Sequence, residues 1–595
     1  MRWVGEIGNP LAVRGVVLVM KTLAVTCIAA ALYTAGPLAA SPAFELKPCE
    51  RADLPADARC ATYEVFENRA AKAGRKVALQ VVVLPAREEP RLPDPIVYFA
   101  GGPGAASIPE GVGLTNEMAG LRTRRDVLLV DYRGTGESDP LNCPGMQGTG
   151  GAQGFLDSFL PVDKVRECWI QLAKERNLSQ YTSDTAVDDI EEVRQALGYG
   201  KLNLMGGSYG TRAVLVFLRR HPQSVRTATL LGVYPTQEKG PLKMARSAQD
   251  ALDGLVAECA GDAACHGAFP KLKDEIAAIL AQAKRDPVSV ELTDPETGKP
   301  ISLKLNRSGV AQTLRYMLYM PTAAAQLPLS VHLAAQGDYK PLAETAYFFA
   351  ANLGSMSDGF FLSVTCAEDL PYIREAEIAP AVSGTYLDDF RIRQQQAACK
   401  AWPVPAVGES FREAVRSDVP AILFSGERDP VTPKTDGELA AGTLSRSRHF
   451  VISDGAHGLG GLSGLECLND LVISFVETAR PEALDASCLA KIERPQFVLA
   501  RERDVKLAAA ELDRLAGTYT SREQGFQVAI ERVGERLRAA VAGQPPLLLV
   551  PLSPTRFRLE GLPGGFLFEF QLADGRAESA SFQQPGQPAQ TLTRE

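Results

Sequence analysis

Ser208 lies in a sequence that is typical of a serine nucleophile. The segment Gly206-Gly207-Ser208-Tyr209-Gly210 fits the pattern G-x-S-x-G, with an apolar run at 202–205 before it and a helical pattern at 209–220 after it. On a sharp turn between a strand and a helix, flanking glycines avoid clashes and the serine hydroxyl is pushed out over the edge of the sheet. The pattern therefore predicts a nucleophile at Ser208. The alternative is an ordinary glycine-rich turn.

A serine hydroxyl is a weak nucleophile unless a base and an orienting acid stand beside it. Asp429 follows the apolar run 421–425 and begins the turn Asp-Pro-Val-Thr-Pro, while His457 lies among small residues after the run 449–453. The chain order serine, acid, histidine is one in which such triads occur. We therefore expect Ser208, Asp429 and His457 to form a catalytic triad. Glu427 is the rival acid, and an uninvolved loop histidine is the alternative for His457.

A second glycine-rich segment, 101–104, could stabilise a developing negative charge. It reads Gly-Gly-Pro-Gly and follows the apolar run 96–100. Backbone donors around a reacting carbonyl stabilise its oxyanion, and one of them is commonly the residue after the nucleophile. We expect the N–H groups of Gly102 and Tyr209 to form this oxyanion hole. A phosphate-binding loop is excluded because no Gly-Lys-Ser/Thr follows.

The composition is that of an ordinary globular protein, with 595 residues of which 45% are hydrophobic and 23% charged. The net charge is −8, and an acidic chain without a long basic run is a poor nucleic-acid binder. None of the five histidines is paired with another at the spacing of metal ligands. We therefore expect no nucleic acid, no metal and no cofactor, and the oligomeric state stays open.

Residues 1–40 are predicted to be a signal sequence rather than part of the fold. Lys21 is followed by an apolar run over 23–33 and then by small residues that end at Ala40, which is the order of regions in a secretory signal. The run is too short to span a bilayer. Met20 is a possible true start of the chain.

The alternative is an uncleaved anchor over 11–33, although Arg14 and Lys21 interrupt it. We favour export, which predicts a periplasmic or secreted protein without stable membrane insertion after the signal is cleaved.

The cysteines also favour an oxidising compartment. Of eleven, Cys27 lies in the apolar run of the signal, and the remaining ten suggest five disulfides in an exported chain. Because the ten fall into close couples separated by wide gaps, we predict the sequential pairs 49–60, 143–168, 259–265, 366–399 and 467–488. The alternative is a set of scattered buried thiols.

The expected catalytic residues must be held in place by a folded core, and the sequence pattern around them predicts a parallel sheet. Buried strand segments alternate with helical patterns and then return late in the chain, at 96–100, 127–131, 202–205, 227–233, 421–425 and 449–453. Strands that alternate with helices form a parallel sheet with crossover helices.

Two other regions differ in character. From 236 to 360 the periodicity is mostly helical, while after 505 short apolar segments are separated by Gly and Pro. We expect a signal sequence over 1–40 and the first part of an α/β core over 41–235. A helical cap insertion over 236–360 is followed by the second part of the core over 361–498 and by a small antiparallel β domain over 505–595.

Five motifs give the chain a resemblance to a known family. They are AGGPG at 100–104, DYRGTGES at 131–138, GGSYG at 206–210, DPVTP at 429–433 and GAHG at 455–458. The chain resembles α/β-hydrolase serine peptidases of the proline iminopeptidase and tripeptidyl aminopeptidase type over roughly residues 45–495. TCAED at 365–369 and CKAWP at 399–403 are similar to the tripeptidyl aminopeptidase branch.

The resemblance implies an α/β-hydrolase fold and exopeptidase action on substrates with a free N-terminus. Proline iminopeptidases usually carry His at the position of Ala100, so strict proline specificity is not implied. Residues 505–595 resemble, more weakly, the small β domain appended to some exported serine hydrolases.

Action on a free N-terminus requires a group that holds the substrate's ammonium, and a carboxylate in a partly dry cleft does so well. Glu368 and Asp369 lie where the chain re-enters the core after the insertion, and they are the first candidates. Glu110 and Glu117, after the AGGPG segment, are weaker candidates. The alternatives are surface acids or charges at a helix N-terminus.

We interpret Asp131 and Arg133 as structural residues that hold the loop beside the site in place. The residues, together with what the resemblance implies, predict an exported serine aminopeptidase that forms an acyl-enzyme on Ser208 and releases short N-terminal peptides or single residues. A carboxylesterase on the same fold is the first alternative, and a non-catalytic binding protein is a remote one. The preference around the scissile bond stays open.

Overall fold

The computed structural model describes residues 44–51, 53–143, 146, 151–295, 297–353, 356–521, 526–541, 544–562, 565–584 and 589–595. The predicted signal sequence and Met20 therefore lie outside the described residues. Within them, none of the helices is both long enough and apolar enough to cross a membrane.

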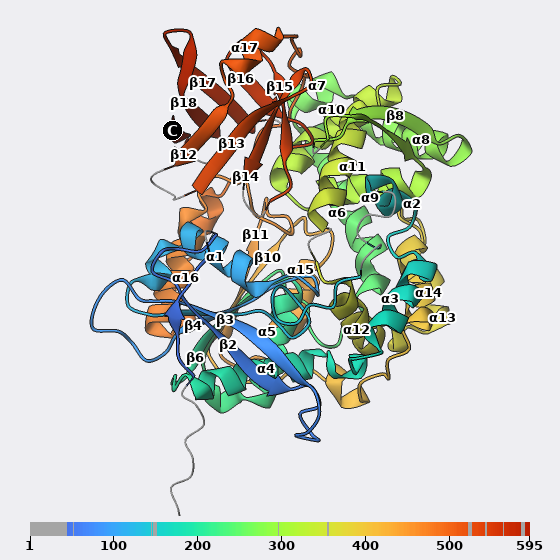
Figure 1. Cartoon of the computed structure of the whole chain (residues 1–595). Helices are drawn as coiled ribbons and strands as arrows, with labels where there is room; N and C mark the ends of the chain where they lie inside the picture. Colours follow the sequence, from blue (N-terminus) through green and yellow to red (C-terminus); the bar gives the residue numbers. More distant parts are fainter. Residues whose placement is uncertain are drawn as a thin grey trace, which may run out of the picture. The chain divides into compact units, whose positions relative to one another are not determined.

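A nine-stranded sheet carries the predicted site (Figure 1). In spatial order its strands are β1 (Lys47–Pro48), β2 (Arg59–Phe66), β3 (Lys76–Leu84), β5 (Val127–Val130), β4 (Ile96–Phe99), β6 (Leu202–Gly207), β7 (Val225–Leu231), β10 (Ala421–Gly426) and β11 (Ser447–Ile452). Neighbours from β5 to β11 pair in parallel, and β1, β2 and β3 add an antiparallel edge. The predicted mostly parallel sheet is confirmed.

Helices cover both faces of this sheet because its strands are apolar on both sides. On one face, residues such as Val97 and Leu204 share a core with α5 (Tyr209–Arg220) and α4 (Ser183–Ala196). On the other, residues such as Ile96 share a core with α16 (Glu466–Thr478) and α1 (Ser107–Glu117). The sheet is therefore held rigidly from both sides, which fixes the loops at its carboxyl edge.

The segment expected to be a helical cap folds mainly as helices with a core of its own. They are α6 (Pro241–Gly261), α7 (Ala263–Ala268), α8 (Leu272–Arg285), α9 (Arg307–Met317), α10 (Pro321–Ala335) and α11 (Lys340–Leu353). Two features were not expected. A hairpin of β8 (Val288–Thr293) and β9 (Pro300–Leu305) interrupts the helices, and Leu156 of α2 (Gly151–Asp157) belongs to the core of the cap.

Helices α12 (Asp358–Glu368), α13 (Glu375–Val382) and α14 (Phe390–Ala401) lead from the cap back to β10. Helix α12 crosses the predicted boundary at 360, and a disulfide joins its Cys366 to Cys399 of α14. The other disulfides are 49–60, 143–168, 259–265 and 467–488. All five predicted pairs are confirmed.

The last part of the chain forms a closed antiparallel barrel with its own apolar core, drawn in orange to dark red in Figure 1. Its strands are β12 (Gly517–Ser521), β13 (Phe526–Val533), β14 (Arg536–Val541), β15 (Leu547–Pro551), β16 (Arg556–Leu559), β17 (Leu567–Ala573), β18 (Arg576–Gln583) and β19 (Gln590–Arg594). Pairing of β12 with β19 closes the barrel, which removes free strand edges. The predicted small β domain is confirmed.

Candidate active site

Ser208 lies on the sharp turn between β6 and α5. Its φ of 53° and ψ of −123° are unusual for a residue with a side chain. The turn is possible because its neighbours are glycines: a Cβ on Gly210 would lie 1.9 Å from the carbonyl oxygen of Phe99. The Ser208 N–H donates to the carbonyl of Leu231 at the end of β7 at 2.9 Å. The half-buried Ser208 side chain is thereby presented at the carboxyl edge of the sheet.

The loop after β4 passes directly beside the serine. A Cβ on Gly101 would lie 3.3 Å from the Cβ of Ser208. Gly102 has a φ of +107°, and a Cβ there would lie 2.6 Å from the nitrogen of Gly104, so only glycine fits. In the described part of the chain neither the Gly102 N–H nor that of Tyr209, the first residue of α5, has an acceptor. Both predicted oxyanion donors are therefore unengaged.

His457 is held by Asp429. Its Nδ1 lies 2.8 Å from Oδ2 of Asp429, and the carboxylate is itself fixed by three further donors. Oδ1 accepts the N–H groups of Val431 and Thr432 at 2.8 Å each, and Oδ2 accepts the Thr432 hydroxyl at 2.7 Å. Asp429 is buried, so the acid that orients the imidazole is itself rigid. Thr432 has a positioning role that the sequence analysis did not assign, although it stands within the quoted DPVTP motif.

The rival residues lie elsewhere. Glu427 is exposed and pairs with Lys434 at 2.6 Å. His449 lies 2.9 Å from the Ser425 hydroxyl. Asp429 is thus the acid that the structure joins to His457.

The serine and the histidine approach the same point of the sheet edge. Gly232 directly follows Leu231, whose carbonyl binds the Ser208 N–H, and a Cβ on Gly232 would lie 3.4 Å from Cε1 of His457. The Ser208 hydroxyl has no hydrogen-bond partner among the residues that the structure describes. Catalytic hydrogen bonds are often long in unliganded enzymes and tighten only with substrate.

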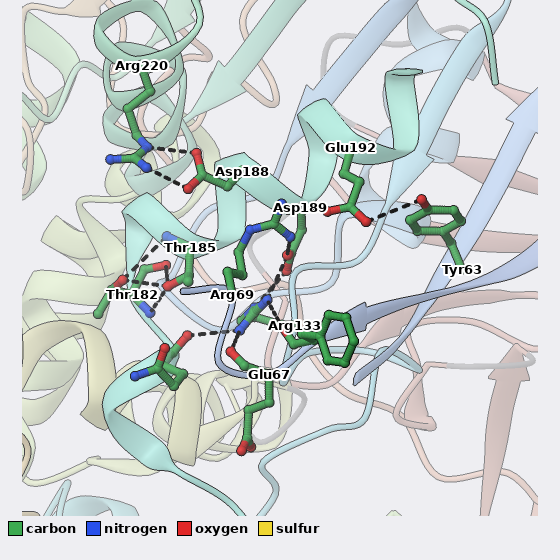
Figure 2. A network of polar contacts seen from close by, with 12 residues as sticks. Tyr63, Glu67, Arg69, Arg133, Thr182, Thr185, Asp188, Asp189, Glu192 and Arg220 are labelled. Carbon is green, nitrogen blue, oxygen red and sulfur yellow. Dashed lines mark hydrogen bonds and ion pairs between the residues drawn. The ribbon is translucent and has the colours of Figure 1, made fainter. Parts of the chain in front are cut away.

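Asp131 and Arg133 hold the loop that follows β5. Asp131 accepts the N–H groups of Ile108 and Glu137 at 2.9 and 3.1 Å, and burial raises its pKa to about 6. Arg133 is fully buried and forms a two-pronged pair with Asp189 of α4, at 2.6 and 2.7 Å. Figure 2 shows the polar contacts around Arg133 and Asp189 from close by. These contacts agree with the interpretation of both residues as structural residues that hold this loop in place.

Glu368 and Asp369 are fully buried beneath the nucleophile turn. Glu368 accepts the N–H and the hydroxyl of Ser183 at 2.7 and 2.8 Å. Asp369 accepts from Arg212 of α5 at 3.0 Å and from the Tyr234 hydroxyl at 2.7 Å. Burial raises the pKa of Glu368 to about 8, which disfavours its charged form. These contacts anchor α4 and α5 and leave neither carboxylate facing open solvent.

The weaker candidate Glu110 is better placed for a ligand. It lies in the first turn of α1 and its side chain is exposed. Its carboxylate accepts from the Tyr98 hydroxyl at 3.1 Å and from the Gly101 N–H at 3.4 Å. Since Gly101 packs against Ser208, this acid is separated from the nucleophile by a single backbone segment. Glu117 is also exposed, at the last turn of the same helix.

The cap contributes a side chain to the site, and this residue belongs to none of the sequence motifs. Tyr319 follows α9, and its ring lies edge-to-face against the His457 ring with centroids 5.2 Å apart. This contact has no signature in the sequence, because it joins two separate segments of the chain.

Comparisons with known proteins agree with this geometry. A family model described as alpha/beta hydrolase fold matches residues 94–268, and one described as TAP-like protein matches residues 385–488. Serine protease Hip1 of Mycobacterium tuberculosis is 25% identical over 484 residues, which cover 75% of this chain and 90% of that protein.

Two further relatives carry peptidase names. Tripeptidyl aminopeptidase of Streptomyces lividans is 24% identical over 425 residues, which cover 66% of this chain and 76% of that protein. Proline iminopeptidase of Neisseria gonorrhoeae is 30% identical over 149 residues, which cover 25% of this chain and 36% of that protein.

Proposed function

Since the chain is a serine hydrolase of the α/β-hydrolase fold and is similar to peptidases of that fold, we propose that it is an exported aminopeptidase. It hydrolyses peptides near a free N-terminus through an acyl-enzyme on Ser208. The observation that carries the proposal is the Asp429–His457 hydrogen bond of 2.8 Å beside the Ser208 turn. The peptidase names of the relatives support peptides as substrates.

In the proposed reaction, His457 Nε2 takes the proton of the Ser208 hydroxyl as the oxygen attacks the scissile carbonyl carbon. Asp429 keeps the other ring nitrogen, Nδ1, protonated and stabilises the imidazolium. The carbonyl oxygen becomes an oxyanion that accepts the N–H groups of Gly102 and Tyr209.

The tetrahedral intermediate then collapses. The C–N bond breaks, His457 gives its proton to the leaving amine, and the acyl group stays on Ser208. A water molecule gives a proton to His457 and attacks the ester carbonyl. The C–O bond to Ser208 then breaks, His457 returns the proton to the serine oxygen, and the acid is released.

Recognition of the ammonium is proposed to lie at Glu110. The burial and full bonding of Glu368 and Asp369 argue against the expected role of these two acids, because a substrate would have to break structural contacts to reach them. Glu110 instead lies beside Gly101 at an exposed position, although burial of its carboxyl group raises the pKa of this residue above its ordinary value. A charge-assisted contact of this kind fixes the N-terminus of the substrate relative to Ser208.

The five disulfides support the export part of the proposal, because such bonds persist in oxidising compartments. We therefore propose that the protein is periplasmic or secreted.

The proposed function is tested with matched substrates. Chromogenic tripeptide amides with a free N-terminus are expected to be cleaved about 10- to 150-fold better than their N-acetylated forms, which is the effect of one charge-assisted contact. The measurement is kcat/KM for each pair. Equal rates on both forms would contradict the aminopeptidase mode, and turnover of simple p-nitrophenyl esters without any peptide cleavage would favour the carboxylesterase.

Glu110→Gln is expected to lower kcat/KM by about 10- to 150-fold on free-N-terminus peptides while leaving ester hydrolysis nearly unchanged. The change removes the charge but keeps the shape, and the triad is untouched. Glu117→Gln, on the same helix, is the matched control and should behave as wild type. If Glu368→Gln shifts the free-to-acetylated ratio and Glu110→Gln does not, the ammonium is held at Glu368 instead.

A further inference from the structure

Arg315, which is buried, and Arg391, which is half-buried, lie near the proposed site, and neither has a salt bridge to a residue that the structure describes. Arg315 of α9 is 2% exposed. Its Nη2 donates to the Tyr319 hydroxyl at 2.6 Å, and its Nε is buried with no hydrogen-bond partner among the described residues. The guanidinium carbon lies 5.0 Å from the centre of the Tyr319 ring and 5.4 Å from that of Tyr316.

Arg391 of α14 has a similar surrounding. Its guanidinium carbon lies 3.6 Å above the Phe159 ring and 5.9 Å from the centre of the Phe361 ring. Its Nε and Nη1 are buried, and no acceptor in the described part of the chain reaches them. Burial, and the like charge of Arg315, lower the pKa of Arg391 to about 10, so the side chain stays charged at neutral pH.

Other arginines of the same region pair with an acidic side chain, and Arg315 and Arg391 have no such partner among the described residues. Arg393, two residues along α14, pairs with Glu375 at 2.5 Å and with Asp389 at 2.9 Å. Arg307, in the first turn of α9, pairs with Asp388 at 2.8 Å. Within the described residues, Arg315 and Arg391 have aromatic rings and the hydroxyls of Tyr319 and Tyr316 in place of such acids.

Buried positive charge without a counter-charge is costly, and buried donors are nearly always satisfied. The unengaged groups of both guanidiniums are donors, and the Tyr386 hydroxyl, whose neighbours include Arg315, is also buried without a partner within the described residues and can donate as well. A carboxylate accepts several hydrogen bonds and matches a guanidinium well. The donors on these side chains therefore match the chemistry of an organic acid.

The position of Arg315 and Arg391 associates them with the leaving-group half of the substrate. One ring, that of Tyr319, separates Arg315 from His457: its hydroxyl binds Arg315 and its edge meets the imidazole. In a serine triad the histidine gives its proton to the leaving group. A group bound beyond Tyr319 therefore belongs to the leaving half of the substrate.

We propose that Arg315 and Arg391 form a subsite for a carboxylate on the leaving-group side of the substrate. This carboxylate is either the C-terminus of a short peptide or an Asp or Glu side chain close to the scissile bond. The inference deepens the proposed function, because it rests on His457 as the residue that protonates the leaving group.

The experiment compares peptides with a free N-terminus that differ only after the scissile bond. One ends in a free carboxylate, one in an amide, and one carries Asp followed by an amide. Wild type is expected to favour one or both acids over the neutral amide by about 10- to 100-fold in kcat/KM, as for a charge-assisted contact. Which acid is favoured identifies the source of the carboxylate.

Arg391→Gln and Arg315→Gln are expected to abolish this preference while the neutral amide is cleaved nearly as by wild type. Arg391→Lys should retain part of it, and Arg393→Gln, on the exposed side of α14, is the matched control that should retain all of it. Cleavage of the neutral amide also shows that each variant is folded. An unchanged preference in both glutamine variants, or no preference in wild type, would overturn the subsite.

A pair of esters separates this inference from the aminopeptidase proposal. 4-Acetoxybenzoate carries a carboxylate on its leaving group, and its methyl ester does not. If peptides are not cleaved but wild type prefers 4-acetoxybenzoate and Arg391→Gln does not, the subsite stands and the aminopeptidase proposal fails. If peptides are cleaved with a free-N-terminus preference and neither substrate set shows an acid preference, the reverse holds.

Discussion

Changing Ser208 to alanine is expected to lower kcat by at least about 10³-fold, since only oxyanion stabilisation and substrate binding then remain. The fold should be unaffected, because the hydroxyl has no hydrogen-bond partner among the described residues and alanine meets the same backbone strain at a φ of 53°. The measurements are kcat on a chromogenic peptide and the thermal unfolding temperature.

His457→Ala should lower kcat to a similar degree, because the base and the nucleophile act as a unit. A fluorophosphonate probe provides an independent readout: it should label wild type and fail to label Ser208→Ala. Near-normal turnover in either variant would refute the triad.

Replacing Asp429 with asparagine is expected to lower kcat by about 10³- to 10⁴-fold. The amide oxygen of asparagine can still accept the N–H groups of Val431 and Thr432. Its NH₂ group, however, would point at Nδ1 of His457 and favour the tautomer that carries its proton on Nε2, which cannot accept the proton of Ser208. The measurement is kcat across neutral pH.

Glu427→Gln is the matched control for this change. It neutralises the exposed acid two residues earlier, which pairs with Lys434, and it should leave kcat close to that of wild type. A large loss in Glu427→Gln together with a small one in Asp429→Asn would assign the acid role to Glu427.

The parts of the molecule that could be predicted are those with short-range signals. The turn at Ser208 was predictable because a strand, glycines and a helix stand next to one another in the chain, and the barrel because apolar segments alternate with Gly and Pro. The disulfides were predictable because every pair closes a local loop. In contrast, the short hairpin β8–β9 was missed because it interrupts a region of mostly helical periodicity. Its residues alternate between exposed and buried or partly buried, which is the period typical of strands.

The contacts of Glu368 and Asp369 could not be predicted because their partners are distant in the chain. Arg212 is 157 residues before Asp369, and Ser183 is 185 residues before Glu368. Sequence position suggested a carboxylate at the mouth of a cleft, but the packing of α12 against the nucleophile helix buries both acids. The environment of Arg315 and Arg391 could not be predicted for the same reason, because the two side chains come close only when α9 and α14 are folded.

The connectivity of the five disulfides has a consequence for biogenesis. Each paired cysteine is joined to the next one along the chain, with separations of 6 to 33 residues. A chain translocated N-terminus first presents its cysteines in this same order. An oxidant that links each newly emerged cysteine to the one before it would produce every native bond, without reshuffling of mispaired intermediates.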